Sequence, residues 1–131
     1  MEGFVKDIEK MTMRNTDFRR VLYTGKHLQL VLMALTPGEQ IGEEVHVSHD
    51  QFFRVEEGAG TVVIDGRSRN VRKNDAIIVP AGARHNIVNI GAVPLKLYTV
   101  YGPPAHRDGT VRATKAEAEA TGEQFDGATT E

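Results

Sequence analysis

The fold is decided by two stretches, PGEQIGEEVHVSHDQFFRVEEGAG at residues 37–60 and PAGARHNIVN at residues 80–89. In the first stretch, Glu44 and His46 are two positions apart. On an extended strand, both side chains therefore leave the same face. The first stretch predicts a strand that presents a carboxylate and an imidazole side by side.

The rest of the two stretches can add to this pair. Residues 47–50 can supply a small turn, after which Gln51, Phe53 and Val55 share one face of the next strand. Far along the chain, His85 follows a Pro-Ala-Gly-Ala turn sequence and begins another strand. If these strands fold back together, four side chains converge on one point: Glu44, His46, Gln51 and His85.

The spacing of these residues resembles the two motifs of the cupin superfamily. The first stretch reads Gly38-x5-Glu44-x-His46-x4-Gln51-x6-Gly58, and the second reads Pro80-x-Gly82-x2-His85-x3-Asn89. The resemblance covers roughly residues 27–101. It implies an all-β fold, a small antiparallel barrel of the double-stranded β-helix or jelly-roll type, with a metal ion at its mouth or in its interior.

The usual metal set of that superfamily is three histidines and one glutamate. His46 and His85 match this pattern, whereas Glu44 stands at the position of the first histidine and Gln51 at that of the glutamate. Asn74 stands where the second motif usually begins with glycine. The resemblance therefore implies a site that keeps one carboxylate but has one imidazole fewer.

Composition limits the class of protein. The 131 residues suffice for one domain, and 40% apolar residues suffice for a modest core. A net charge of -2 favours neither nucleic acid nor an acidic membrane as a partner. No long apolar run, signal-peptide pattern or cysteine is present, so we expect a cytoplasmic protein without disulfides.

Local patterns predict the elements without any appeal to family. Eight or so short strands at regular spacing, with turn signals such as Asp65-Gly66, are typical of a β-barrel. Residues 27–36 are almost continuously apolar, which indicates a strand buried on both faces. The covering neighbour is either a second subunit, which would make a homodimer, or the N-terminal arm.

These patterns divide the chain into three parts. Residues 1–26 are expected to form an arm on the barrel, with a short strand at residues 19–24, and residues 27–101 to form the barrel. Residues 102–131 are expected to be a partly disordered extension. Within it, residues 114–120 can form a short helix with Thr114 as its cap and Glu117 completing a capping box.

The four converging side chains make a mixed nitrogen and oxygen site. Such a set suits one divalent metal ion per chain, with Zn, Mn, Fe or Ni as the candidates. Because glutamine is a weak ligand, we expect lower affinity than in the usual set. The alternative is a metal-free pocket in which Glu44, His46 and Gln51 form hydrogen bonds across the barrel.

Other residues are candidates for the pocket wall. His49 shares strand parity with Gln51, so it is either a rival metal ligand or a solvated loop residue. Phe53 is a wall or core candidate. Tyr98 and Tyr101 lie on opposite faces of the last strand, so at most one faces inward. We expect Tyr98 to be the one that lines the pocket. His27 and His106 are expected at the surface.

The predicted function is metal-dependent handling of a small polar molecule. Glu44, if not bound to the metal, is the candidate general base. The resemblance admits an isomerase of a sugar or keto-acid, of the kind called mannose-6-phosphate isomerase-like, and a non-haem Fe(II) dioxygenase. A different class of function is a non-catalytic barrel that binds or senses a small ligand.

Overall fold

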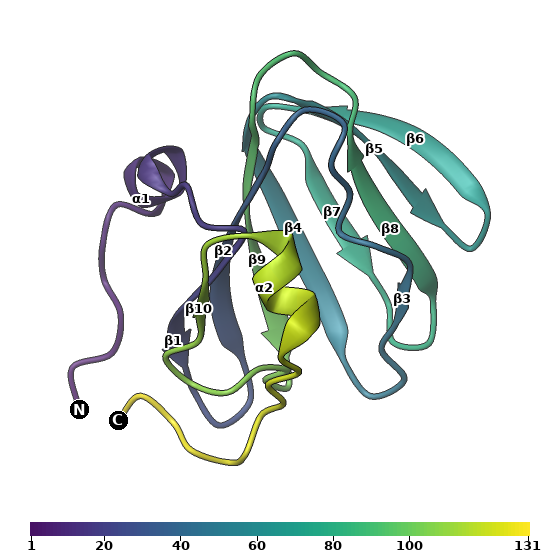
Figure 1. Ribbon diagram of the computed structural model, residues 1–131. Coiled ribbons are helices and arrows are strands. Elements are labelled where there is room, and N and C mark those ends of the chain that lie inside the picture. The colour runs from purple at the N-terminus through teal and green to yellow at the C-terminus, as the bar shows by residue number, and fades with distance from the viewer.

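The computed structural model describes residues 1–131, which form two antiparallel sheets facing each other around one core (Figure 1). The strands are β1 (Arg19–Thr24), β2 (Gln29–Leu35), β3 (Glu44–Val45), β4 (Asp50–Glu57), β5 (Ala59–Ile64), β6 (Arg67–Arg72), β7 (Ala76–Val79), β8 (Arg84–Asn89), β9 (Leu95–Gly102) and β10 (Val111–Arg112). The helices are α1 (Ile8–Arg14) and α2 (Lys115–Ala120). The all-β jelly-roll barrel predicted from the sequence is confirmed.

The strand order explains how distant stretches meet. One sheet has the order β10-β1-β2-β9-β4-β7 and the other the order β3-β8-β5-β6. Residues alternate between core and outer face, as on β9, where Leu95, Leu97, Thr99 and Tyr101 are buried. Both sheets contribute to one apolar cluster, with Phe53 among its fully buried members. This cluster is the floor on which the polar site lies.

The N-terminal arm covers part of the outer face of the larger sheet. Leu32, on the outer side of β2, is only 2% exposed and lies beside Met11 and Asn15. The Lys96 ammonium on β9 donates to the Met13 carbonyl at 2.6 Å. Cover by the arm thus accounts for the doubly buried strand, and the second subunit stays a prediction.

The chain ends are joined to the barrel more closely than the sequence suggested. The predicted strand at residues 19–24 is present as β1, and it pairs with both β2 and β10 in the larger sheet. The last residues run back along β1, where the Thr130 amide donates to the Thr24 carbonyl at 2.9 Å. The Gly3 amide donates to Glu131 at 2.9 Å, so the two termini lie together (Figure 1).

Local turn and cap chemistry agrees with the sequence. Asp65 and Gly66 both have positive φ, 47° and 81°, as the predicted hairpin turn requires. Asn74 has a φ of 77°, so it adopts the left-handed conformation that a glycine would take more easily. The Thr114 side chain accepts from the Glu117 amide at 3.1 Å and caps α2 as predicted, whereas the Glu117 carboxylate accepts from the Ala113 amide at 3.0 Å and not from the Thr114 amide of a capping box. Neither helix is long and apolar enough to span a membrane.

Gly58 lies where the β4–β5 turn packs against the start of β9, and a substitution at this position tests that packing. Its φ is 93°, and an added Cβ would lie 2.8 Å from the Pro94 carbonyl oxygen. Gly58→Ala should lower the free energy of unfolding by about 1–3 kcal/mol, because strain and overlap act together. Urea denaturation measures the change. Gly122→Ala is the matched control, since its Cβ would meet nothing within 4 Å. Equal stabilities of the two variants would contradict this packing.

Candidate metal centre

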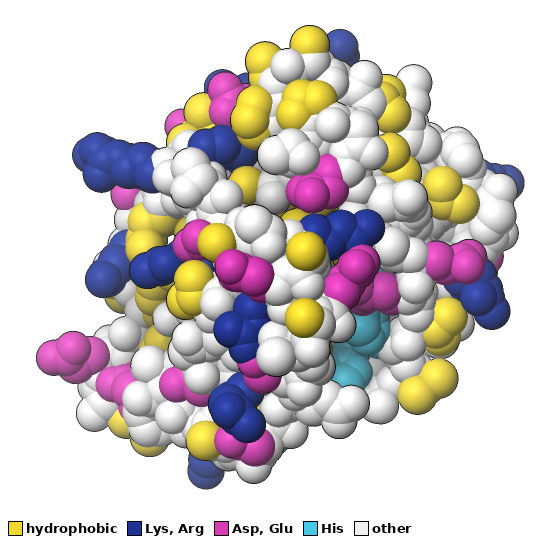
Figure 2. Space-filling model, viewed as in Figure 1, with side chains coloured by type: hydrophobic (Ala, Val, Ile, Leu, Met, Phe, Trp, Pro, Cys, Tyr) yellow, Lys and Arg dark blue, Asp and Glu magenta, His cyan; other side chains and the backbone are white.

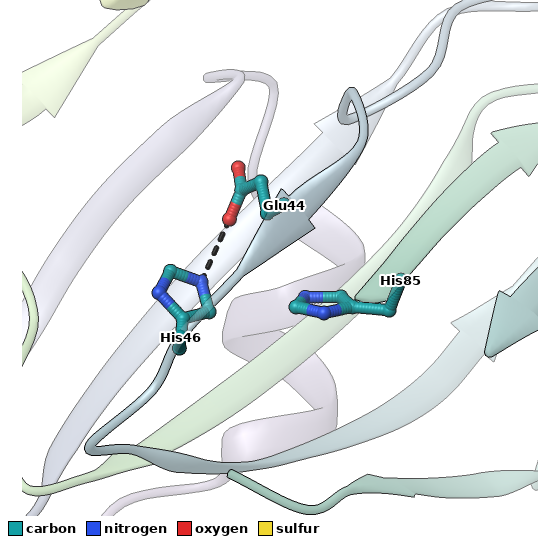
Figure 3. Close-up of side chains that lie close together, drawn as sticks. All are labelled: Glu44, His46 and His85. Carbon is teal, nitrogen blue, oxygen red and sulfur yellow. Dashed lines mark hydrogen bonds and ion pairs between the residues drawn. The ribbon is translucent and has the colours of Figure 1, made fainter. Parts of the chain in front are cut away.

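The centre begins with the carboxylate and imidazole at β3. Glu44 lies on β3 and His46 directly follows it, and the His46 Nε2 and Glu44 Oε2 atoms are 2.8 Å apart. Their side chains leave the same face, as the spacing predicted (Figure 3). The Gly82 amide donates to the His46 carbonyl at 2.9 Å, which ties the second motif to the first. Gly82 has a φ of 89°, so its glycine identity suits this turn.

His85 comes from β8, the neighbour of β3. The register pairs Glu44 with His85 directly, which brings the imidazole toward Glu44 and His46 (Figure 3). The His85 Nδ1 atom lies 3.4 Å from the Ala83 carbonyl oxygen, and the contact favours the proton on Nδ1. The His85 Nε2 atom is buried and has no hydrogen-bond partner. Its lone pair is therefore free for a ligand.

Gln51 faces the barrel interior from the other sheet, where it pairs with Tyr101 of β9. It is 3% exposed, and its Nε2 donates to the Thr99 hydroxyl at 3.0 Å. Its Oε1 atom is buried without a hydrogen-bond partner. An orphaned buried acceptor costs free energy, about 1–3 kcal/mol, unless a further group satisfies it. Gln51 thus offers a second free electron pair within the barrel.

These donors fit a divalent metal ion. The ligand atoms of Glu44, His46 and His85 all lie within 4.8 Å of one another. Two imidazole nitrogens, a carboxylate and an amide oxygen form a set that first-row divalent metals accept. A metal-free, hydrogen-bonded pocket would not explain why the His85 Nε2 and Gln51 Oε1 atoms lack partners. The barrel therefore contains a possible metal site made by Glu44, His46 and His85, and Gln51 stays a predicted fourth ligand.

The pKa shifts of Glu44 and His85 keep both side chains in the protonation states that can bind a metal ion. Burial alone would raise the pKa of Glu44, but the hydrogen bond and charge of His46 outweigh it, and the pKa is lowered. Burial lowers the pKa of His85, against the opposing effects of the Ala83 carbonyl and the Glu44 charge. At neutral pH, Glu44 is a carboxylate and His85 a neutral imidazole, as metal binding requires.

The three predicted wall residues have different positions. His49 lies at the pocket wall, with its Nε2 2.9 Å from the Pro104 carbonyl and its ring 5.7 Å from that of His46. It is outside the Glu44, His46 and His85 group. Phe53 is fully buried with its ring 6.4 Å from that of His85, so it forms the core beneath the site.

The assignment of Tyr98 to the pocket is wrong. Tyr98 lies on the outer face of β9, where its ring packs 6.2 Å from that of Phe52. Tyr101 has the opposite parity and faces inward, with its ring 5.8 Å from that of His46. Burial, helped by the Glu44 charge, raises the pKa of Tyr101, so its hydroxyl stays protonated at neutral pH.

His106, expected at the surface, also belongs to the pocket. Its Nε2 lies 3.3 Å from the Tyr101 hydroxyl. The buried Gln29 side chain holds this segment, because its Oε1 accepts from the His106 amide at 3.0 Å and its Nε2 donates to the His106 carbonyl at 2.8 Å. No local sequence signal marks this contact. His27 is exposed, as predicted.

A cavity of about 710 Å³ opens directly above these groups. Its lining includes Arg19, Glu44, His46, His49 and His106, together with part of the C-terminal segment at residues 118–125. Histidine side chains are visible in a recess on this face, beside acidic side chains (Figure 2). The alternation of Arg19 with buried Val21 on β1 was the signal that could have placed Arg19 inside.

The fold and the site define a class of small β-barrel whose polar interior contains a possible metal site. The chain belongs to the cupin family, since the Cupin domain model matches residues 31–101. The chain is 50% identical to the uncharacterized protein YrkC of Bacillus subtilis over 122 residues, which are 88% of this chain and 65% of that protein. This chain thus spans less than two thirds of that relative.

Solved structures agree with the family assignment. The structure of BH2720 from Bacillus halodurans has a TM-score of 0.89 and 49% identity, covering 92% of this chain and 96% of that chain. The structure of TT1209 from Thermus thermophilus has a TM-score of 0.68 and 26% identity, covering 76% of this chain and 96% of that chain. The first likeness extends beyond the barrel into the terminal segments, so it concerns nearly the whole chain.

Removal of a candidate ligand should remove the metal and leave the fold. In Glu44→Ala and in His85→Ala, metal affinity should fall at least about 100-fold, because each loses one donor of the set. Plasma mass spectrometry of dialysed, untagged protein gives the metal content, and circular dichroism checks the barrel. His27→Ala, an exposed histidine, is the control. Full metal content in both ligand variants would contradict the assignment.

His106 should make stability depend on pH. Burial, reinforced by the Arg19 charge, lowers its pKa to about 3 from 6.5. Between these values the unfolded chain binds a proton that the folded chain does not. The free energy of unfolding is therefore highest above pH 6.5 and decreases as the pH falls, by about 2 kcal/mol at pH 5.

His106→Asn should flatten this dependence. Urea denaturation at pH 7 and pH 5 measures it, with His27→Asn as the control that retains the wild-type slope. A slope unchanged in His106→Asn would show that this histidine titrates normally in the folded state.

Proposed function

We propose that this cupin is a metal-dependent enzyme acting on a small polar molecule held above Glu44. The observation that carries the proposal is that two buried acceptors inside the barrel, His85 Nε2 and Gln51 Oε1, have no partner, and that His85 lies next to the Glu44–His46 pair. A barrel that only filled its interior would have no reason to leave both atoms without partners. A bound ligand set explains them together.

The residues have separate roles in this proposal. His46, His85 and Gln51 hold a divalent ion, and Glu44 either completes the set or stands beside it. When bound, such an ion polarises a carbonyl or hydroxyl oxygen as a Lewis acid. Glu44, kept ionised by His46, accepts a proton from the carbon next to that oxygen. The protonated Tyr101 hydroxyl is a hydrogen-bond donor on the pocket floor.

Proton transfer favours an isomerase as the reaction class. An ionised carboxylate and a protonated phenol in one pocket form a base and a donor, which keto–enol chemistry of a sugar or keto-acid needs. A dioxygenase is the second candidate, because two histidines and one carboxylate are the ligands that non-haem Fe(II) uses. A non-catalytic binding barrel remains the alternative of another class.

Two measurements on the same protein separate these functions. Protein loaded with Mn, Fe, Ni or Zn is incubated in D₂O with aldoses and 2-oxo acids, and proton NMR follows exchange beside the carbonyl. We expect exchange in the wild type, at least a 100-fold slower rate in Glu44→Gln, and an unchanged rate in His27→Ala. An oxygen electrode tests the Fe(II)-loaded protein.

The outcomes point to different classes. Oxygen uptake without deuterium exchange would favour the dioxygenase. If chelation lowers the melting temperature and no substrate of either class reacts, the enzyme proposal fails and the binding barrel takes its place.

A further inference from the structure

Arg19 points into the barrel next to the candidate metal site. It has the same strand parity on β1 as the buried Val21, and it lies opposite the buried Met33 of β2. Its neighbour Arg20 faces outward, where its guanidinium lies 3.1 Å from the Asp17 carboxylate. One strand therefore sends two adjacent arginines to opposite faces, and only the outer one has a carboxylate partner; the Arg19 guanidinium carbon lies 5.5 Å from the centroid of the Phe18 ring.

The Arg19 guanidinium has no anionic partner in the protein. Its Nε is buried without a hydrogen bond, and no carboxylate lies within ion-pair distance of it. Arg54 and Arg112, whose Nε atoms also lack a hydrogen bond, are each ion-paired, with Glu56 and Glu123. A charged group turned inward without a partner is costly, which indicates an anion supplied from outside the chain.

The cavity that Arg19 lines is the one above the metal site. Among the cavity-lining residues it is the one lysine or arginine, and Glu44, His46 and His106 share the same wall. Glu123, the other acidic residue of the lining, is occupied by Arg112. Glu44 is engaged by His46 at 2.8 Å, which leaves Arg19 as the charged group of this wall without an ion-pair partner, although the ionised Glu44 lies in the same cavity.

We propose that Arg19 binds the carboxylate of the substrate, so that the substrate is a small hydroxy- or oxo-acid. The planar guanidinium offers a fork of donors that matches a carboxylate. One positive charge balances a monoanionic carboxylate, whereas a phosphate brings up to two negative charges and the lining offers no second fixed cation. This inference rests on the proposed function, because it assigns the far end of the same substrate.

Binding at Arg19 would also orient the molecule. With the carboxylate at β1, the adjoining carbon and its oxygen face the shared cavity on the side of Glu44 and His46. A neutral sugar would leave the guanidinium unsatisfied. Of the two isomerase substrates considered above, the keto-acid therefore fits this pocket and the uncharged sugar does not.

The test measures binding with and without the metal. Zinc-loaded and metal-free ¹⁵N-labelled protein is titrated with lactate, with the neutral propane-1,2-diol and with inorganic phosphate, and chemical shifts give the Kd values. Arg19→Gln should weaken lactate binding at least about tenfold. It should leave diol binding unchanged and zinc affinity within threefold. Arg20→Gln, the outward neighbour, should match the wild type.

Other results of these titrations would overturn specific parts of the proposal. Unchanged lactate affinity in Arg19→Gln, or no binding of lactate to either form of the wild type, would overturn the role of Arg19. Arg19-dependent binding of phosphate that is tighter than lactate would overturn the carboxylate assignment. Failure of the wild type to bind zinc would count against the proposed function, while the metal-free titration would still decide the role of Arg19.

The ¹⁵N spectra also show whether each variant is folded. The ¹⁵N spectrum of Arg19→Gln must keep the wild-type dispersion. If it does not, Arg19→Lys serves in its place, because it keeps the charge but loses the planar fork. It should bind lactate more weakly than the wild type and keep the zinc affinity, and full lactate affinity in Arg19→Lys would contradict bidentate binding.

Discussion

The short pairing of β3 with β8 is the constraint on which the site depends. It sets Glu44 opposite His85, two residues from distant parts of the chain. β3 has only two residues, so it needs support from its neighbours. β8 is held on its other side by β5, and the Gly82 amide fixes the backbone at His46. A shift of one residue in this register would turn Glu44 or His85 to the opposite face.

The site combines a rigid floor with an open, charged mouth. Phe53 and the apolar cluster beneath His85 fix its ring, while Gln51 is fixed by its bond to Thr99. Above them, Glu44 and Arg19 carry opposite charges into one cavity. Candidate ligands below and an arginine without an ion-pair partner above are an arrangement that supports the proposed binding of a small molecule.

Residue spacing predicted the barrel and the meeting of Glu44, His46 and His85, because period and parity are local properties. It failed where tertiary contacts decide. Strand alternation predicts that Tyr98 and Tyr101 lie on opposite faces of β9, but it does not predict which face packs against the core. His106 lies in the pocket because the buried Gln29 holds its backbone, a contact that joins residues far apart in sequence. The last residues lie along β1 through contacts of the same kind, such as the Thr24 amide donating to the Thr130 hydroxyl.

The central claim is that Glu44, His46, Gln51 and His85 form a metal centre on which the chemistry of the pocket depends. Anomalous diffraction, recorded above and below the absorption edge of the metal found in the purified protein, tests it most directly. We expect one strong anomalous peak per chain among these four side chains. No peak there after loading with Mn, Fe, Ni or Zn, or a peak only at surface residues, would contradict it.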